Sequence, residues 1–239
     1  MIGCIVQARV GSSRLPRKVM KLIDGKNPVI HYVLKQLEYS KFLKQIVVAT
    51  TNNPNDDQIV DYLEKNNHMF FRGDEKDVLD RFYLCSKKFS FSIIVRITSD
   101  NPLIDPSIVD TMIEEFEKHH YDYMTNSIPR TFPFGTEVEI FTFNALENAW
   151  KNAKNETERE HVTPYFYNNP EKFKIKKIES SYNMSGLRWT LDEYSDFILI
   201  QNIIKKIKKS PILLDDILEL HQKEPQLFKI NENVKHKIL

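Results

Sequence analysis

A short basic loop follows the first apolar run of the chain. Residues 8–18, ARVGSSRLPRK, follow the apolar run IGCIV and include the cations Arg9, Arg14 and Lys18, with the small residues Gly11, Ser12 and Ser13 among them. Backbone N–H groups of a Gly/Ser turn and planar guanidinium groups both bind phosphate oxygens. The loop is neither a Walker A loop nor a dinucleotide fingerprint, because Gly11 stands alone. A solvated basic turn is the alternative, but the position after a first strand favours a polyphosphate site.

Two acidic residues far apart in the sequence could hold a metal ion beside such a phosphate. Asp100 follows the apolar run IIVRIT, and Asp192 ends the segment LRWTL. Mg²⁺ needs only one or two protein carboxylates, because phosphate oxygens and water complete its shell. Asp105, directly before Pro106, fits a helix N-cap better than a metal site. Asp192 fits an N-cap and a metal ligand equally well.

The elements that must position these residues alternate between strand and helix patterns. Apolar strands are expected at Ile2–Val6, Gln45–Thr51, HMFF and Ser92–Thr98, separated by single amphipathic helices. Such alternation is typical of an α/β fold with a mostly parallel sheet sandwiched by helices. Loops at the carboxyl ends of parallel strands form the ligand site in these folds. The basic loop and Asp100 are therefore expected to lie at the same edge of the sheet.

The second half of the chain has a different pattern. We expect a strand, an irregular loop and a strand within residues 121–141, then a helix at 143–152 and a strand in FKIKKIE. A strand in LRWTL and two lysine-rich helices follow. The prediction is one domain over residues 1–239, with a small lid or dimerisation lobe at about 121–179.

Composition excludes several classes of protein. The 239 residues carry a formal net charge of +1, so no global basic field for nucleic acid is expected. No apolar run approaches the roughly 20 residues that span a bilayer, so no membrane insertion is expected. Cys4 and Cys85 lie in apolar settings and are interpreted as buried thiols of a reducing, cytoplasmic protein.

Seven segments together resemble a known family. IVQARVGSSRLPRKVM resembles the signature loop of the CMP-sugar synthetases. Together with VVATTNNPNDD, FRGDEKDVLDRF, VRITSDNPLIDP, GTEVEIF, EREHVTPYFY and LRWTLDEYSD, it most resembles the spore-coat polysaccharide protein F type of cytidylyltransferase. The resemblance covers roughly residues 1 to 200. It implies a GT-A-like (Rossmann-like) domain that transfers CMP from CTP to a small acceptor and releases pyrophosphate.

The resemblance also implies site residues. Arg14, Lys18 and Asp100 would be catalytic, and Asp100 and Asp192 would bind Mg²⁺. The nucleotide would contact the first loop and the ends of the next strands: Gln7, Ala8, Arg9, Gly11, Ser12, Arg14, Lys18, Thr50, Thr51, Arg72 and Thr98. The acceptor would contact residues of the lobe: Arg130, Glu137, Glu139, Arg159 and His161. LDEYSDF lacks the proline that relatives carry after the first acid, and GTEVE replaces Gly-Leu-Asp-Val-Glu. The choice of acceptor is therefore open.

Two other functions stay open at this stage. A GT-A glycosyltransferase would use a nucleotide-sugar, but TSDNP offers one acid where the Asp-x-Asp motif of those enzymes has two. A non-catalytic nucleotide-binding protein would not require Arg14, Lys18, Asp100 and Asp192 together. By analogy with the family, a homodimer is expected.

Overall fold

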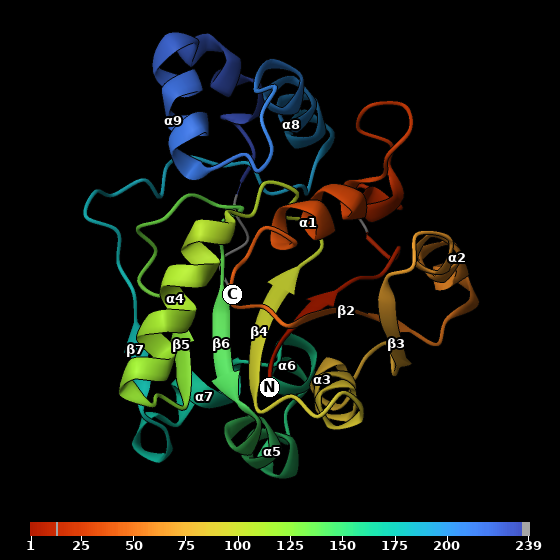
Figure 1. The fold of residues 1–239 in the computed structure, drawn as a ribbon, viewed down its shortest axis with the longest axis vertical. Helices are drawn as coiled ribbons and strands as arrows, with labels where there is room; N and C mark the ends of the chain where they lie inside the picture. The colour runs from red at the N-terminus through yellow and green to blue at the C-terminus, as the bar shows by residue number, and fades with distance from the viewer. Residues whose placement is uncertain (13, 236–239) are drawn as a thin grey trace.

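One mixed sheet carries the fold (Figure 1). The computed structural model describes residues 1–12 and 14–235, so Ser13 of the basic loop lies outside the described residues. Seven strands of this part are ordered β3-β2-β1-β4-β6-β5-β7. Their bounds are β1 Ile2–Gln7, β2 Gln45–Thr51, β3 Met69–Gly73, β4 Ile93–Thr98, β5 Tyr123–Thr125, β6 Glu139–Thr142 and β7 Ile175–Lys177.

The parallel part of the sheet confirms the expected alternation. β1 pairs in parallel with both β2 and β4, and β2 pairs in parallel with β3. β6 runs antiparallel to β4 and to β5, while β7 is parallel to β5. Segment 121–179 therefore contributes three strands to the same sheet as the first half of the chain.

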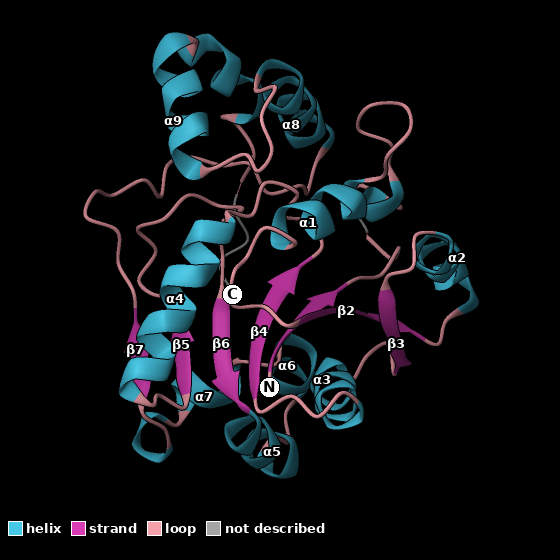
Figure 2. Cartoon of the chain, in the orientation of Figure 1, coloured by secondary structure: helices cyan, strands magenta, loops and turns pink. Residues whose placement is uncertain are grey.

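Helices cover both faces of the sheet (Figure 2). One apolar cluster joins the sheet to α1 (Val29–Leu37), α2 (Asp57–Lys65) and α4 (Pro106–His119). A second cluster on the other face includes α3 (Val78–Lys88), α5 (Phe143–Asn152) and α7 (Pro164–Asn168), and α6 (Glu156–His161) precedes α7. The predicted sandwich is confirmed, and Trp189 and both cysteines are buried as expected.

A third layer lies beyond the carboxyl ends of β1 and β4. It contains α8 (Tyr194–Lys206), α9 (Leu214–Lys223) and the 3₁₀ helix η4 (Pro225–Asn231), which share an apolar cluster with part of α1. α8 and α9 lie together at the top of Figure 1. Shorter 3₁₀ helices occur at η1 (Lys18–Met20), η2 (Pro54–Asp56) and η3 (Pro170–Lys172). No helix in the described part of the chain is long and apolar enough to cross a membrane.

Helix starts follow local chemistry. Asp105 caps α4 by accepting a hydrogen bond from Ser107 N, with Pro106 at the first helical position, as predicted. Asp77 caps α3 in the same way through Asp80 N, so the acids of RGDEKDVLDRF belong to a helix start.

The predicted strand in LRWTL is wrong. Residues 187–191 form no strand of the sheet, and Arg188 makes an isolated parallel bridge with Phe134. The segment leaves the sheet because Arg188 turns inward to acids near the start of α8, and Leu191 N donates to Asp100 O at 2.8 Å. This bond brings the two predicted metal ligands to one place.

Candidate active site at the carboxyl ends of β1 and β4

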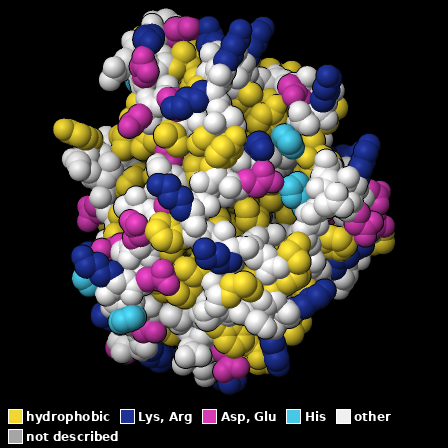
Figure 3. Space-filling view, in the orientation of Figure 1, with side chains coloured by type: hydrophobic (Ala, Val, Ile, Leu, Met, Phe, Trp, Pro, Cys, Tyr) yellow, Lys and Arg dark blue, Asp and Glu magenta, His cyan; other side chains and the backbone are white. Residues whose placement is uncertain are grey.

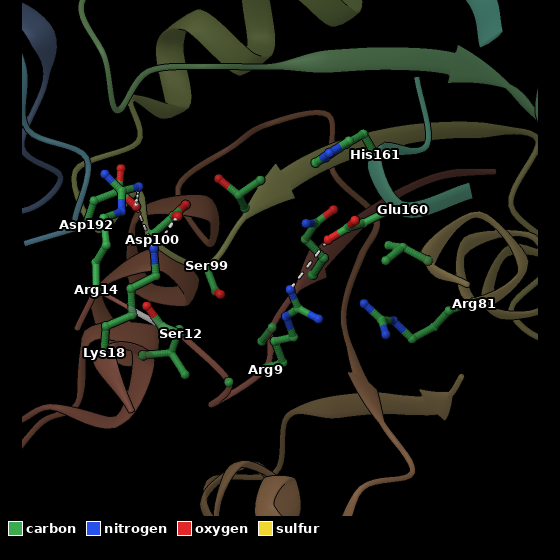
Figure 4. Close-up of a pocket in the computed structure, with 16 residues that line it drawn as sticks. Arg9, Ser12, Arg14, Lys18, Arg81, Ser99, Asp100, Glu160, His161 and Asp192 are labelled. Carbon is green, nitrogen blue, oxygen red and sulfur yellow. Dashed lines mark hydrogen bonds and ion pairs between the residues drawn. The ribbon is translucent and has the colours of Figure 1, made fainter. Parts of the chain in front are cut away.

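A cavity of about 280 Å³ opens where the basic loop faces the end of β4 (Figure 4). Its walls come from the basic loop and the ends of β1 and β4, with α3, α6 and the segment before α8. The lining residues are Gln7, Ala8, Arg9, Gly11, Ser12, Arg14, Lys18, Val19, Val78, Arg81, Thr98, Ser99, Asp100, Glu160, His161 and Asp192. All predicted first-loop residues, Thr98, both predicted metal ligands and His161 are therefore brought together.

An ion cluster forms one end of the cavity. Lys18 Nζ lies 2.7 Å from Asp100 Oδ2 and 3.0 Å from Asp192 Oδ1, and it also donates to Leu191 O at 2.8 Å. Arg14 Nη2 lies 2.9 Å from the same Asp192 oxygen. Burial lowers the pKa of Lys18, but Asp100 and Asp192 outweigh it and the pKa is raised. Lys18 is therefore a fixed positive charge at this end.

A buried ion network holds Asp192 from behind. Arg188 Nη2 donates to Asp192 Oδ2 at 2.8 Å, and Arg188 Nε lies 3.0 Å from Asp196 Oδ1. Asp196 is fully buried and also accepts from Asn231 Nδ2 in η4 at 2.8 Å. Burial raises the pKa of Asp192, but Lys18, Arg188 and Arg14 outweigh it and lower the pKa to about 2. Asp192 is thus ionised and oriented.

The basic loop is anchored by the element that follows β2. Buried Asp56 accepts a hydrogen bond from Val10 N at 2.7 Å, and it also bonds to the Thr51 hydroxyl. Arg17, in a left-handed conformation before η1, donates two hydrogen bonds to Gln58 Oε1 of α2. The loop that carries Arg14 and Lys18 is therefore fixed at both ends.

The opposite end of the cavity contains Arg81, Arg9, Glu160 and His161 (Figure 4). Arg9 lies 3.9 Å from Glu75 and 3.7 Å from Glu160, which are loose contacts between exposed side chains. Arg81 is only 2% exposed, and its Nε has no hydrogen-bond partner among the described residues. Burial and the nearby Arg9 lower the pKa of Arg81 to about 10, so it stays charged at neutral pH.

Three predicted nucleotide contacts lie outside the cavity wall. Thr50 and Thr51 are buried in β2, and Thr51 is committed to Asp56. Arg72 donates to Thr51 O at 2.8 Å and to Asn53 O at 3.0 Å, and it pairs with Asp57 at 2.7 Å. These contacts tie β3 to the loop after β2, which gives Arg72 a structural task.

Four of the five predicted acceptor residues also lie outside the wall. Arg159 pairs with Asp77, the cap of α3, rather than with a neighbouring glutamate. Glu139 lies behind the cavity floor, where it pairs with Arg96 and accepts from the Tyr123 hydroxyl at 2.5 Å. Arg130 and Glu137 pair with each other at 2.6 Å. Each of these four side chains forms a salt bridge that could not be predicted from the spacing of residues in the sequence.

Three polar wall residues were absent from the predicted set: Arg81, Ser99 and Glu160. Ser99 and Glu160 are sequence neighbours of the predicted Thr98, Asp100 and His161, so a wider window around those motifs includes them. Arg81 faces the cavity from α3. The pattern of polar and apolar residues along this helix predicts only that a charged side chain such as Arg81 is exposed or half-buried. Its burial without a carboxylate partner is visible only in the tertiary structure.

The three oxygen atoms that accept hydrogen bonds from Lys18 are also suitable ligands for a hard divalent cation. Two carboxylates and one backbone carbonyl converge on one point, and carboxylate and carbonyl oxygens are the ligands Mg²⁺ prefers. Among residues 1–12 and 14–235, no three His, Cys, Asp or Glu side chains gather as a metal site. A cation here would therefore need oxygens from a bound ligand and from water as well.

Charges elsewhere on the surface are mixed. On the face seen in Figure 3, basic and acidic side chains are interspersed, in agreement with the net charge of +1.

Comparisons with known proteins identify the family. A family model described as cytidylyltransferase matches residues 3–234. The chain is 41% identical to protein MJ1063 of Methanocaldococcus jannaschii, over 98% of this chain and 95% of that one. It is 31% identical to the spore coat polysaccharide biosynthesis protein SpsF of Bacillus subtilis, over 92% of this chain and 94% of that protein.

A solved structure shows the same fold over the whole chain. The structure of a cytidylyltransferase from Leptospira borgpetersenii superposes with a TM-score of 0.91 at 32% identity. The alignment covers 100% of this chain and 98% of that one. The expected family and the GT-A-like α/β fold are both confirmed. This chain belongs to the cytidylyltransferase family and is a nucleotidyltransferase.

Proposed function

We propose that the protein is a Mg²⁺-dependent enzyme that transfers CMP from CTP to an acidic sugar, a phosphosugar or a similar small acceptor. One observation carries this proposal: Asp100 and Asp192 meet beside Lys18 and Arg14 in one cavity. Negative charge on phosphate oxygens is the main quantity such an enzyme stabilises. The name of the Bacillus subtilis relative supports a role in polysaccharide biosynthesis.

The cations of the first loop would bind the triphosphate. Arg14 and Lys18 lie at the carboxylate end of the cavity, so they would neutralise the leaving pyrophosphate, and Ser12 and Gly11 offer further donors nearby. Asp100 and Asp192 would hold Mg²⁺. When bound, Mg²⁺ acts as a Lewis acid on phosphate oxygens and lowers the barrier to in-line displacement.

The base would lie toward Arg81. A buried guanidinium without a carboxylate partner is costly, and acceptor atoms of a ligand would offset that cost. Arg81 lies at the end of the cavity away from Asp192, as Figure 4 shows. A nucleotide whose phosphates lie against Lys18 would extend its base in this direction.

The acceptor would approach from α6. His161 lines the cavity, and burial, Arg96 and Arg9 lower its pKa despite Glu160. A neutral imidazole at pH 7 can accept a proton from an attacking hydroxyl group. The lobe at 121–179, in which α6 lies, would thus supply acceptor contacts through His161 and Glu160.

A pyrophosphate-release assay tests this function. The purified protein, with Mg²⁺, is supplied with each of the four nucleoside triphosphates against a library of acidic sugars and phosphosugars. CTP with at least one acceptor should release pyrophosphate. Asp100→Asn should lower kcat/KM by about 100- to 1,000-fold, because a charge contact to the transition state is lost.

Asp61→Asn, an exposed acid of α2, serves as the matched control and should keep wild-type turnover. Release of a nucleoside diphosphate from a nucleotide-sugar, without pyrophosphate from any triphosphate, would contradict the proposal and indicate a glycosyltransferase. Wild-type turnover by Asp100→Asn would show that Asp100 is not a ligand of the proposed metal.

A further inference from the structure

The carboxylates proposed to hold the metal are already bridged by a cation of the chain itself. We propose that the Lys18 ammonium group occupies the metal position in the ligand-free protein, so that a divalent cation enters only together with the triphosphate. This inference rests on the proposed function and adds an order of binding to it. Lys18 is then both a placeholder for the metal and a phosphate ligand.

The contacts of Lys18 use all its donors. An ammonium group has three N–H donors, and Nζ reaches three oxygens: Asp100 Oδ2 at 2.7 Å, Leu191 O at 2.8 Å and Asp192 Oδ1 at 3.0 Å. These are the oxygens that suit Mg²⁺, which binds at about 2.0–2.1 Å. Ammonium and metal therefore compete for the same ligands.

The Asp192 carboxylate is held from behind by a buried arginine, and the backbone of Asp100 is tied to the same segment. Asp192 Oδ2 accepts from Arg188, whose own position is fixed by fully buried Asp196. The backbone of Asp100 is bonded to Leu191 N at 2.8 Å. Lys18 has a flexible four-carbon stem, and its backbone is fixed in η1. The group that moves on metal entry is therefore the ammonium.

The charge balance favours joint entry. Asp100, Asp192 and Asp196 balance Lys18, Arg14 and Arg188 in one connected cluster. A divalent cation alone would add two positive charges and displace Lys18 from its partners with no new anion to receive it. A triphosphate brings about four negative charges, so the metal complex is net negative and offers oxygens to Lys18 and Arg14.

Manganese binding tests this inference without measuring turnover. Mn²⁺ suits the same oxygen ligands as Mg²⁺, and co-elution of Mn²⁺ with the protein on gel filtration separates protein-bound ion from free Mn²⁺ and from the Mn²⁺–CTP complex. Wild-type protein should leave Mn²⁺ free when nucleotide is absent and bind it when CTP is added. Lys18→Met should bind Mn²⁺ alone at least about tenfold more tightly than wild type. In Lys18→Met/Asp100→Asn the gained binding should disappear.

Lys21→Met is the matched control, because Lys21 lies over the Phe197 ring outside the cavity wall. It should behave as wild type. Lys18→Gln provides a second variant if Lys18→Met does not fold, as judged by circular dichroism. Equal Mn²⁺ affinity of wild type and Lys18→Met without nucleotide would overturn the inference.

A different result would separate the two proposals. If Lys18→Met gains Mn²⁺ binding but CTP brings no Mn²⁺ to the wild-type protein, the proposed function fails. The assignment of Lys18 to the metal position would still be supported by that result.

Discussion

At the scale of single residues, Arg81 and Arg159 differ in how completely their guanidinium groups are paired. The Arg81 side chain is buried, its Nη1 donates to Asp74 O at 2.6 Å, and its Nε has no partner among the described residues. Arg159, by contrast, forms a close pair with Asp77 and donates to Trp150 O at 2.8 Å. Arg81 thus keeps an unused donor in the cavity wall, whereas Arg159 joins α6 to α3.

Substitution of these two arginines should therefore have opposite effects. Arg81→Met should weaken CTP binding by about tenfold or more and cost less than about 1 kcal/mol of unfolding free energy, because an unpaired buried charge is removed with its single bond. Arg159→Met should destabilise the fold, because it leaves Asp77 without its partner, and should affect CTP binding less. Urea unfolding and calorimetric titration with CTP measure both quantities. A large loss of stability with unchanged affinity in Arg81→Met would contradict the assignment.

At the scale of elements, the basic loop depends on its neighbours for its shape. Its described residues form no regular element before η1, and its contacts with Asp56 and Gln58 come from the segment after β2. Thr51 and Arg72 support that segment from β2 and β3. Thr51 and Arg72, which were expected to touch the nucleotide, contact the segment that anchors the loop.

Asp56→Ala should weaken nucleotide binding although Asp56 does not line the cavity. The Val10 N–H would lose its acceptor, at a cost of about 1–3 kcal/mol, and the loop would become less ordered. Asp56→Asn keeps an acceptor oxygen for Val10 and should restore most of the affinity. Calorimetric titration with CTP measures the effect, and hydrogen exchange of residues 9–12 reports the order of the loop. Full affinity in Asp56→Ala would show that the anchor is dispensable.

At the scale of the whole molecule, the C-terminal layer braces the site. Arg188, Asp196 and Asn231 join the segment before α8, α8 itself and η4 in one buried network. This network holds Asp192 against Lys18, so distant parts of the chain share one ion cluster. The homodimer expected from the family stays a prediction.

This network should make stability depend on acid pH. Burial raises the pKa of Asp196, but hydrogen bonds from Arg188 and Asn231 outweigh it, so the pKa is lowered. The pKa of Asp192 is lowered from 3.8 to about 2. The folded state therefore gains stability that is fully present above pH 3.8 and is lost as the pH falls toward 2. Arg188→Met should cost about 3–5 kcal/mol near neutral pH, because a buried charge loses its partner.

The difference between wild type and Arg188→Met should shrink as the pH is lowered through this window. Urea unfolding at pH 6, 3.5 and 2.5 measures it. A constant difference at all three values would show that the two carboxylates do not supply the stabilisation.

The sequence alone was sufficient for the parallel half of the fold and for one end of the site. Apolar runs of β-branched residues and single amphipathic helices predict β1 to β4, and the resemblance to the family implies that Lys18, Asp100 and Asp192 lie in one site. Local chemistry also predicts Asp105 as the cap of α4. The strands, the helices and the cap depend on short-range patterns, which a linear sequence records directly.

The tertiary structure alone decided which charges are available to a ligand. Arg159, Glu139 and Arg72 pair with opposite charges on other elements, Arg130 pairs with Glu137 of its own loop, and none of the four lines the cavity, whereas Arg14 and Asp100 are also paired but lie in its wall. Arg81 meets none within salt-bridge distance among the described residues. Charge pairing also explains why LRWTL lies outside the sheet. Arg188 of this segment pairs with Asp192 and with Asp196 near the start of α8. Local patterns specify strands and helices, whereas the pairing of charges depends on distances between segments that only folding brings together.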